Sequence, residues 1–277
     1  MGLYSLSNGI VSVAVDASDG MNVISMKYKG QEVVECDLEK KRAGRTYAIP
    51  ILFPTPNRTR NDCYLFDGLL VKTHRHGFAR KSDFEVVCAD SSSILGSCSY
   101  PRHEGFPYDI DFSVRISLSD STVKWDFCIV NRGERPFPFG LALHPYFRKD
   151  LFRAVSSSHE KAMLMDGEML PTGETVDSDY STPVMIDDLD VDSVFLADES
   201  IESKLLGDDL SLSITASEEF NHVVIFTEKS SRTICVEPQT CSTDFVNLHN
   251  KGYKKEANML VVSGKESRRL SIEMRFA

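Results

Sequence analysis

Alternation of apolar and polar residues with a period of two is the dominant pattern along this chain. Between residues 112 and 118 every second position is Phe, Val, Ile or Leu, and after a turn at Asp120-Ser121 the segment 123–129 alternates in the same way. Such alternation is typical of half-buried strands, and two runs joined by a short turn predict a hairpin. Helical periodicity is weak and predicts only short helices near 150–155 and 187–200. Further short strands are predicted at 11–15, 23–28, 84–88, 210–215, 223–227, 233–236, 259–262 and 270–276.

Many short strands separated by turns predict an all-β fold of the sandwich or barrel type. No linker rich in proline, glycine or serine divides the chain, so we expect one domain covering residues 1–277. Residues 148–192 have a mixed, loop-like pattern that differs from the strand-rich segments on either side. Because long loops in compact β domains often shape binding sites, this stretch is expected to contribute to a pocket.

Charge and cysteine content narrow the classes of partner. The formal net charge is −10 and no run of lysines and arginines is present, which argues against nucleic acid or an anionic membrane. No apolar run is long enough to span a membrane, and the N-terminus does not have the pattern of a secretory signal. The seven cysteines are scattered and include no Cys-x-x-Cys pair, as expected for reduced thiols in a cytoplasmic protein. A small neutral ligand fits best, although a locally basic pocket would suit an anionic one; the oligomeric state is not indicated.

Two ionisable residues, His144 and Glu237, each end an apolar run and stand immediately before a proline. Proline restricts the preceding residue to extended conformations, so both side chains are expected at strand ends. Alternation places His144 on the same face as Ala142, and Glu237 on the same face as Cys235. These small neighbours leave room for a ligand, and a histidine and a carboxylate presented in this way suit proton transfer.

Two further segments place polar residues beside apolar runs, one ending in Asn57-Arg58 and one containing His76-Gly77. Taken alone, His76 also fits a turn residue, Arg58 a surface charge, and Glu237 the partner of a lysine or arginine at a sheet edge. The other histidines have polar neighbours in the sequence and are expected to be solvated. They are His74, His103, His159, His222 and His249.

A metal site is the rival interpretation of the same residues. His74 and His76, together with His144 and Glu237, are similar to the ligands of a cupin-like barrel, in which alternate residues of a strand hold a transition metal. The segments around them lack the glycine-rich spacing of that family, so we do not expect a metal. The sequence also has no nucleophilic serine turn and no glycine-rich phosphate loop.

Taken in order, four segments resemble those of the aldose 1-epimerase (galactose mutarotase) superfamily. Pro54-Thr55-Pro56-Asn57-Arg58 is similar to its Asn-Arg segment, His76-Gly77 to its first histidine motif, and His144-Pro145-Tyr146-Phe147 to its second. Each motif is weak alone, but four in this order make a specific signal. The glutamate motif is matched by Glu237-Pro238-Gln239-Thr240, with Asp244 and Asn247.

The resemblance implies a β-supersandwich, with large antiparallel sheets and few short helices, that binds a monosaccharide without a cofactor. It implies an isomerase that interconverts the α and β anomers of a hexose. Glu237 would remove the proton of the anomeric hydroxyl, His144 would protonate the ring oxygen, and His76 would hydrogen-bond the sugar near the anomeric centre. Substrate binding would fall to Asn57, Arg58 and Asp192.

Two alternatives stay open. His76-Gly77-Phe78-Ala79-Arg80 also resembles the hexose-6-phosphate branch of the superfamily, and Arg60, Arg75 and Arg80 would suit a phosphate. The other alternative is a non-catalytic carbohydrate-binding sandwich, against which the presence of both Glu237 and His144 argues. The proline-rich segment before Arg58 favours a free aldose as the substrate.

Overall fold

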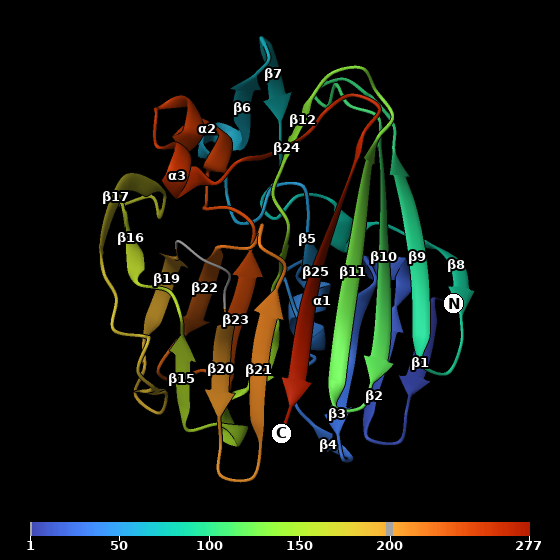
Figure 1. Cartoon of the computed structure of the whole chain (residues 1–277), viewed down its shortest axis with the longest axis vertical. Helices are drawn as coiled ribbons and strands as arrows, with labels where there is room; N and C mark the ends of the chain where they lie inside the picture. The colour runs from blue at the N-terminus through green and yellow to red at the C-terminus, as the bar shows by residue number, and fades with distance from the viewer. Residues whose placement is uncertain (1, 198–201) are drawn as a thin grey trace.

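Antiparallel strands make up most of the protein (Figure 1). The computed structural model describes residues 2–197 and 202–277. Two large sheets dominate the described residues, and both contribute side chains to one hydrophobic core cluster. The predicted all-β sandwich, with large antiparallel sheets and short helices, is therefore confirmed.

The first large sheet contains the predicted hairpin at its centre. Its strands are β8 (Glu85–Ala89), β9 (Ser93–Tyr100), β10 (Ile110–Ser119), β11 (Thr122–Asn131), β15 (Ala154–Ser157), β18 (Val184–Met185), β20 (Glu202–Leu206), β21 (Ser211–Ala216) and β25 (Ser267–Phe276). Their order is β18-β15-β20-β21-β25-β11-β10-β9-β8. In the β10–β11 pair Phe112 lies opposite Ile129 and Leu118 opposite Val123, and buried positions alternate along both strands. The period of two therefore places one face of this hairpin in the core.

The second large sheet carries a strand that is buried along its whole length. Its strands are β5 (Ile51–Leu52), β13 (Ala142–Leu143), β14 (Tyr146–Arg148), β16 (Lys161–Met165), β17 (Pro171–Asp177), β19 (Val191–Leu196), β22 (His222–Thr227) and β23 (Thr233–Gln239). Their order is β17-β16-β19-β22-β23-β13-β5, and β14 also pairs with β23. Figure 1 shows β22 and β23 behind β20 and β21. Strand β23, which is buried throughout, thus lies between β22 and the β13–β14 segment.

Smaller elements complete the described fold. One is a four-stranded sheet of β1 (Leu3–Ser7), β2 (Val11–Asp16), β3 (Asn22–Tyr28) and β4 (Gln31–Glu32). Two separate two-stranded sheets are formed by β6 (Cys63–Phe66) with β7 (Leu69–Lys72) and by β12 (Phe137–Phe139) with β24 (Leu260–Val262). The helices are α1 (Leu38–Arg42), α2 (Phe245–Asn250) and α3 (Lys254–Ala257), and the 3-10 turns are η1 (Ala17–Asp19), η2 (Arg60–Asp62), η3 (Ala79–Lys81) and η4 (Lys149–Leu151). Among the described residues, no helix combines the length and apolar character needed to cross a bilayer.

The two helices predicted from weak periodicity are wrong. The first candidate, 150–155, is the end of η4 followed by the start of β15, and the second, 187–200, contains β19; residues 198–200 lie outside the described part. The stretch 148–192, expected to be loop-like, contributes strands to both large sheets. Except in the β16–β17 hairpin, each of these strands pairs with a strand that is not its neighbour along the chain, so local alternation does not identify them.

Phe53, which follows β5, anchors the Asn57-Arg58 segment to the core. Its ring stacks on Phe112 of β10 with centroids 4.4 Å apart and meets Phe78 edge-on at 6.1 Å. Complete burial of one such ring contributes about 1.5–3 kcal/mol. The chain entering the segment 54–58 is therefore fixed by aromatic packing rather than by local propensity.

Gly77 packs directly against the backbone of Phe53. The two residues form an isolated parallel bridge, and Gly77 has a φ of +67°. A Cβ at this position would lie 2.1 Å from the Phe53 carbonyl oxygen. Only glycine therefore fits between the loop that carries His76 and the chain leading to Asn57.

Replacing Gly77 with alanine should lower the free energy of unfolding by about 3 kcal/mol or more, because a left-handed φ and a backbone clash are combined. Gly68 is the matched control, since its φ is +74° and nothing lies within 4 Å of the position that its Cβ would take. Gly68→Ala should cost only about 1–2 kcal/mol. Urea unfolding of both variants measures the difference, and equal losses would contradict the packing argument.

Two histidines expected to be solvated are buried. His159 has its Nδ1 2.5 Å from Ser157 Oγ, and His222 has its ring nitrogens 2.7 Å from Asn221 Oδ1 and 3.0 Å from the Glu256 carbonyl oxygen. Burial lowers the pKa of His159 to about 3 and that of His222 to about 4. The expectation failed because packing against other strands, not the polarity of sequence neighbours, sets the exposure of a side chain.

The buried His222 should make the protein less stable in mild acid. Between pH 6.5 and about 4 the unfolded chain binds a proton at this histidine and the folded chain does not, so stability falls as pH falls. His222→Gln should therefore reduce the slope of unfolding free energy against pH by up to about 1.4 kcal/mol per unit in this window. Urea unfolding at several pH values tests this, with the exposed His103→Gln as control; identical slopes for His222→Gln and the wild type would refute it.

Candidate active site

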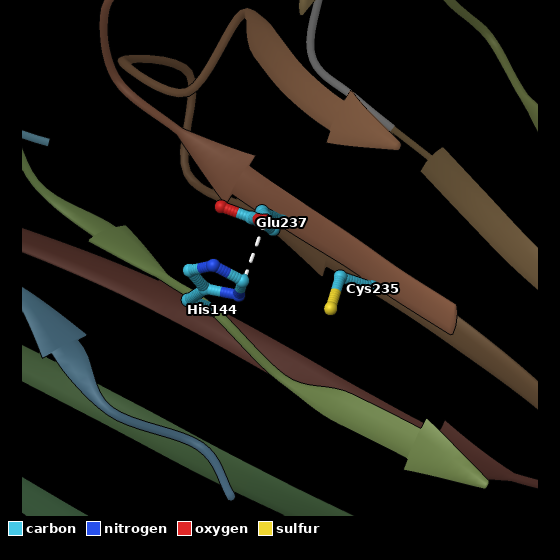
Figure 2. A group of neighbouring side chains, drawn as sticks. All are labelled: His144, Cys235 and Glu237. Atoms are coloured by element: carbon cyan, nitrogen blue, oxygen red, sulfur yellow. Dashed lines mark ion pairs between the residues drawn. The ribbon is translucent and has the colours of Figure 1, made fainter. Parts of the chain in front are cut away.

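His144, Glu237 and His76 come together from three separate segments. His144 lies between β13 and β14, Glu237 lies in β23, and His76 precedes η3. The Nδ1 atom of His144 is 3.1 Å from Glu237 Oε1 (Figure 2), and the rings of His76 and His144 have centroids 5.7 Å apart. The two residues that precede prolines thus share one site.

A cavity of about 500 Å³ opens onto this group. It includes Asn57 and Asp192 as well as the three residues above. The volume is within the range of small-molecule sites. The other lining residues are Lys40, Arg45, Thr46, Arg75, Arg80, Tyr146, Val224, Phe226, Glu228 and Ser231.

Backbone and aromatic contacts fix His144. Its backbone N–H donates to the Pro50 carbonyl at 3.1 Å, and its ring stacks on Tyr146 with centroids 4.6 Å apart. The Tyr146 hydroxyl lies 3.3 Å from His144 Nε2 and 2.7 Å from Thr46 Oγ1. Nδ1 is close to Glu237 but has no partner in hydrogen-bond geometry among the described residues.

A chain of amides supports Glu237. Gln239 Nε2 donates to Glu237 Oε2 at 3.1 Å, and Asn57 Nδ2 donates to Gln239 Oε1 at 3.1 Å and to Thr243 Oγ1 at 2.9 Å. The sequence analysis included Gln239 in the glutamate motif but assigned it no role, although its place two residues after Glu237 puts it on the same face of β23. These contacts hold the carboxylate in one orientation.

His76 is oriented by the backbone of Asn57. The Asn57 N–H donates to His76 Nδ1 at 3.2 Å, and the His76 N–H donates to the Asn57 carbonyl at 2.7 Å. Both residues have positive φ, +67° for His76 and +59° for Asn57. Because Nδ1 accepts, a neutral His76 carries its proton on Nε2 and is a hydrogen-bond donor there.

Burial dominates the electrostatics of the site. It lowers the pKa of His144 to about 3, and the charges of Arg75 and Lys40 add to this. Burial likewise lowers the pKa of His76 well below its usual value, helped by His144 and Arg75. The pKa of Glu237 is raised well above its usual value by burial and by the charge of Asp192. The protein environment therefore favours the uncharged forms of both His144 and Glu237.

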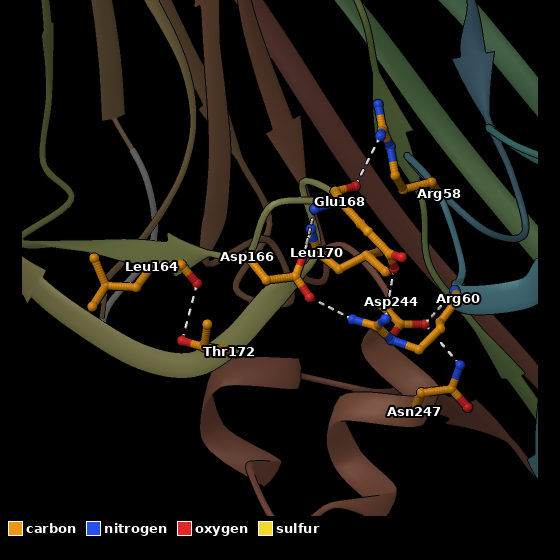
Figure 3. A network of polar contacts seen from close by, with 9 residues as sticks. All are labelled: Arg58, Arg60, Leu164, Asp166, Glu168, Leu170, Thr172, Asp244 and Asn247. Atoms are coloured by element: carbon orange, nitrogen blue, oxygen red, sulfur yellow. Dashed lines mark hydrogen bonds and ion pairs between the residues drawn. The ribbon is translucent and has the colours of Figure 1, made fainter.

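Asp192 reaches the cavity from β19. Its pKa is raised by partial burial, which outweighs the attraction of Arg58 and Arg75. Arg58 is not among the residues that line the cavity; it lines a neighbouring hollow together with Arg75. Its Nη1 donates to the Glu168 carbonyl at 3.0 Å (Figure 3). Of the predicted substrate-binding residues, Asn57 and Asp192 thus line the cavity and Arg58 does not.

The residues around Arg58 form a polar network that holds the β16–β17 loop (Figure 3). Arg60 pairs with Asp166 at 2.5 Å and with Glu168 at 2.7 Å. Asp244 Oδ1 accepts a hydrogen bond from the backbone N–H of Arg60 at 3.0 Å and another from Asn247 Nδ2 at 2.7 Å. Asp244 and Asn247, which belong to the predicted glutamate motif, therefore connect η2 to α2.

The chain is similar to known proteins over nearly its full length. A family model described as aldose 1-epimerase matches residues 2–274. An uncharacterized protein of Escherichia coli K12, YihR, is 24% identical over 239 residues, which are 79% of this chain and 76% of that protein.

Solved structures share the fold. A galactose mutarotase-like protein from Clostridium acetobutylicum superposes with a TM-score of 0.87 at 19% identity, covering 99% of this chain and 94% of that one. Another from Lactobacillus casei gives 0.83 at 19% identity and covers both chains completely. The fold is that of the galactose mutarotase-like sandwiches, and the family match shows that the chain belongs to the aldose 1-epimerase family.

Proposed function

We propose that this protein interconverts the α and β anomers of a hexose by opening and reclosing the sugar ring. The observation that carries the proposal is the close approach of His144 to Glu237 at one cavity, with Nδ1 and Oε1 3.1 Å apart. Anomer exchange needs an acid and a base that act on two oxygens attached to one carbon. A histidine and a carboxylate held side by side meet this need without a bimolecular encounter.

In the proposed reaction Glu237 accepts the proton of the anomeric hydroxyl while His144 gives a proton to the ring oxygen. The bond between the anomeric carbon and the ring oxygen breaks and an aldehyde forms. Rotation about the adjacent carbon–carbon bond and reversal of both proton transfers give the other anomer, so the pair returns to its starting state. His76, a donor at Nε2, is suited to hydrogen-bond a sugar oxygen beside the anomeric carbon.

The reactive form of the pair is an ion pair, with the proton on His144 and the charge on Glu237. Burial opposes this form, whereas the hydrogen bond from Gln239 favours the carboxylate. Sugar hydroxyls entering the cavity would add further donors and acceptors. Substrate binding is thus proposed to bring the pair into its working protonation state.

Glu237→Gln should keep sugar binding but slow anomer exchange by about 10²–10⁴-fold, because an amide of the same shape cannot accept the proton. Glu228→Gln, at another glutamate lining the cavity, is the matched control and should keep most of the rate. Polarimetry of freshly dissolved α-glucose and α-galactose measures exchange, and calorimetry measures binding. An unchanged rate in Glu237→Gln would remove Glu237 from the proposed role; binding without exchange in the wild type would indicate a carbohydrate-binding protein.

A second candidate, a hexose-6-phosphate 1-epimerase, is favoured by the cations in the cavity wall. Lys40, Arg45, Arg75 and Arg80 line it, and none of them pairs with a carboxylate among the residues the structure describes. Nε of Arg80 is buried and has no hydrogen-bond partner there, while its Nη1 donates to the Gly44 carbonyl at 3.1 Å. Guanidinium groups without a carboxylate partner suit a phosphate.

Arg80→Gln separates the two candidates. With a phosphorylated substrate, the loss of a charge-assisted contact should raise KM for glucose 6-phosphate by about tenfold or more and leave that for free glucose nearly unchanged. Lys81→Gln is the control, since Lys81 is the next residue of η3 but does not line the cavity. Exchange rates with glucose and glucose 6-phosphate side by side provide the measurement. An equal change in KM for glucose and for glucose 6-phosphate would count against a phosphorylated substrate.

A further inference from the structure

A cysteine lies directly beside the proposed acid–base pair. Cys235 is two residues before Glu237 in β23, so both side chains lie on the same face of the strand, and it pairs across the sheet with Tyr146. One potential ligand atom from each of Cys235, His144 and Glu237 lies within 4.8 Å of the other two (Figure 2). All three residues are buried.

The three groups present electron-pair donors with few partners of their own. His144 Nδ1 is buried and makes no hydrogen bond within the described residues. The thiol of Cys235 is free of any disulfide. Glu237 uses Oε2 to accept from Gln239 and turns Oε1 toward His144. A nitrogen, a sulfur and an oxygen therefore converge on one point of the site.

This donor set matches zinc. Zn²⁺ binds histidine nitrogen and carboxylate oxygen at about 2.0–2.2 Å and thiolate sulfur at about 2.3 Å, so tetrahedral ligands lie roughly 3.3–3.7 Å apart. The pair His144 Nδ1 and Glu237 Oε1 is already at 3.1 Å. Bringing the widest separation into range needs a movement of about 1 Å, within reach of side-chain rotation.

We propose that Cys235, His144 and Glu237 form a reversible Zn²⁺ site whose occupation inhibits the enzyme. Binding converts the thiol to a thiolate, with its proton released to solvent, and uses the lone pair of His144 Nδ1 and a carboxylate oxygen of Glu237. A water molecule from the adjoining cavity, which His144 and Glu237 line, would complete the four ligands. The inhibitory part rests on the proposed epimerase function, because the metal occupies its acid and its base.

Cobalt binding tests the site without reference to catalysis. Co²⁺ replaces Zn²⁺ at such sites, and a thiolate ligand gives a near-ultraviolet charge-transfer band. The wild-type protein should show this band at one equivalent, and Zn²⁺ should abolish it. Cys235→Ser and Cys235→Ala should both lack it, whereas Cys241→Ser, at another buried cysteine, should retain it. A wild-type protein without the band, or Cys235 variants with it, would overturn the proposal.

Anomer exchange tests the inhibition. Zn²⁺ should slow exchange by the wild type and by Cys241→Ser, and EDTA should restore the rate. For Cys235→Ser the concentration giving half inhibition, relative to its own zinc-free rate, should rise by at least about tenfold, since one of three protein ligands is lost. Equal sensitivity of wild type and Cys235→Ser would refute the inference. If no sugar is exchanged at all, the epimerase proposal fails while the cobalt band still decides the metal site.

Discussion

The removal of His144 and Glu237 from water, side by side, is the constraint around which this protein is organised. A carboxylate and an imidazole cost free energy to bury, and here the cost is limited because both favour their uncharged forms in the cavity. Strand β23, buried along its length, supplies Glu237, and the β13–β14 segment on its flank supplies His144. The sheet therefore fixes the separation of the pair through backbone pairing, which is stiffer than any loop.

The side of the cavity formed by His76 and Asn57 is held by packing against the core rather than by pairing within the second large sheet. Phe53 packs among aromatic rings of the first large sheet, and Gly77 lies against its carbonyl. His76 and Asn57 follow from these two anchors. Movement of one wall relative to the other would thus require repacking of the core, so the cavity is largely preformed before a ligand binds.

Sequence periodicity was sufficient to predict the central hairpin, because a strand with one buried face has apolar residues at every second position. It also predicted that Cys235 and Glu237 share one face of a strand. It failed at β15 and β19, where pairing partners far along the chain determine the structure. The prolines after His144 and Glu237 predicted extended backbone in or beside a strand, which the structure has at both residues. They did not predict that the two residues are close together, because that depends on strand order. The burial of His159 and His222 depends on tertiary packing, which no local sequence pattern encodes. The same holds for the contact of Arg58 with the Glu168 carbonyl.

Asn57 serves both sides of the cavity at once. Its backbone N–H sets the tautomer of His76, and its side-chain amide holds Gln239, which in turn holds Glu237. A change of residue or of conformation here would alter the hydrogen bonding of His76 and the support of Glu237 together. Under the proposed function, a new sugar preference would evolve most freely at uncharged cavity positions such as Val224 and Phe226, whose side chains shift the pKa of neither His144 nor Glu237.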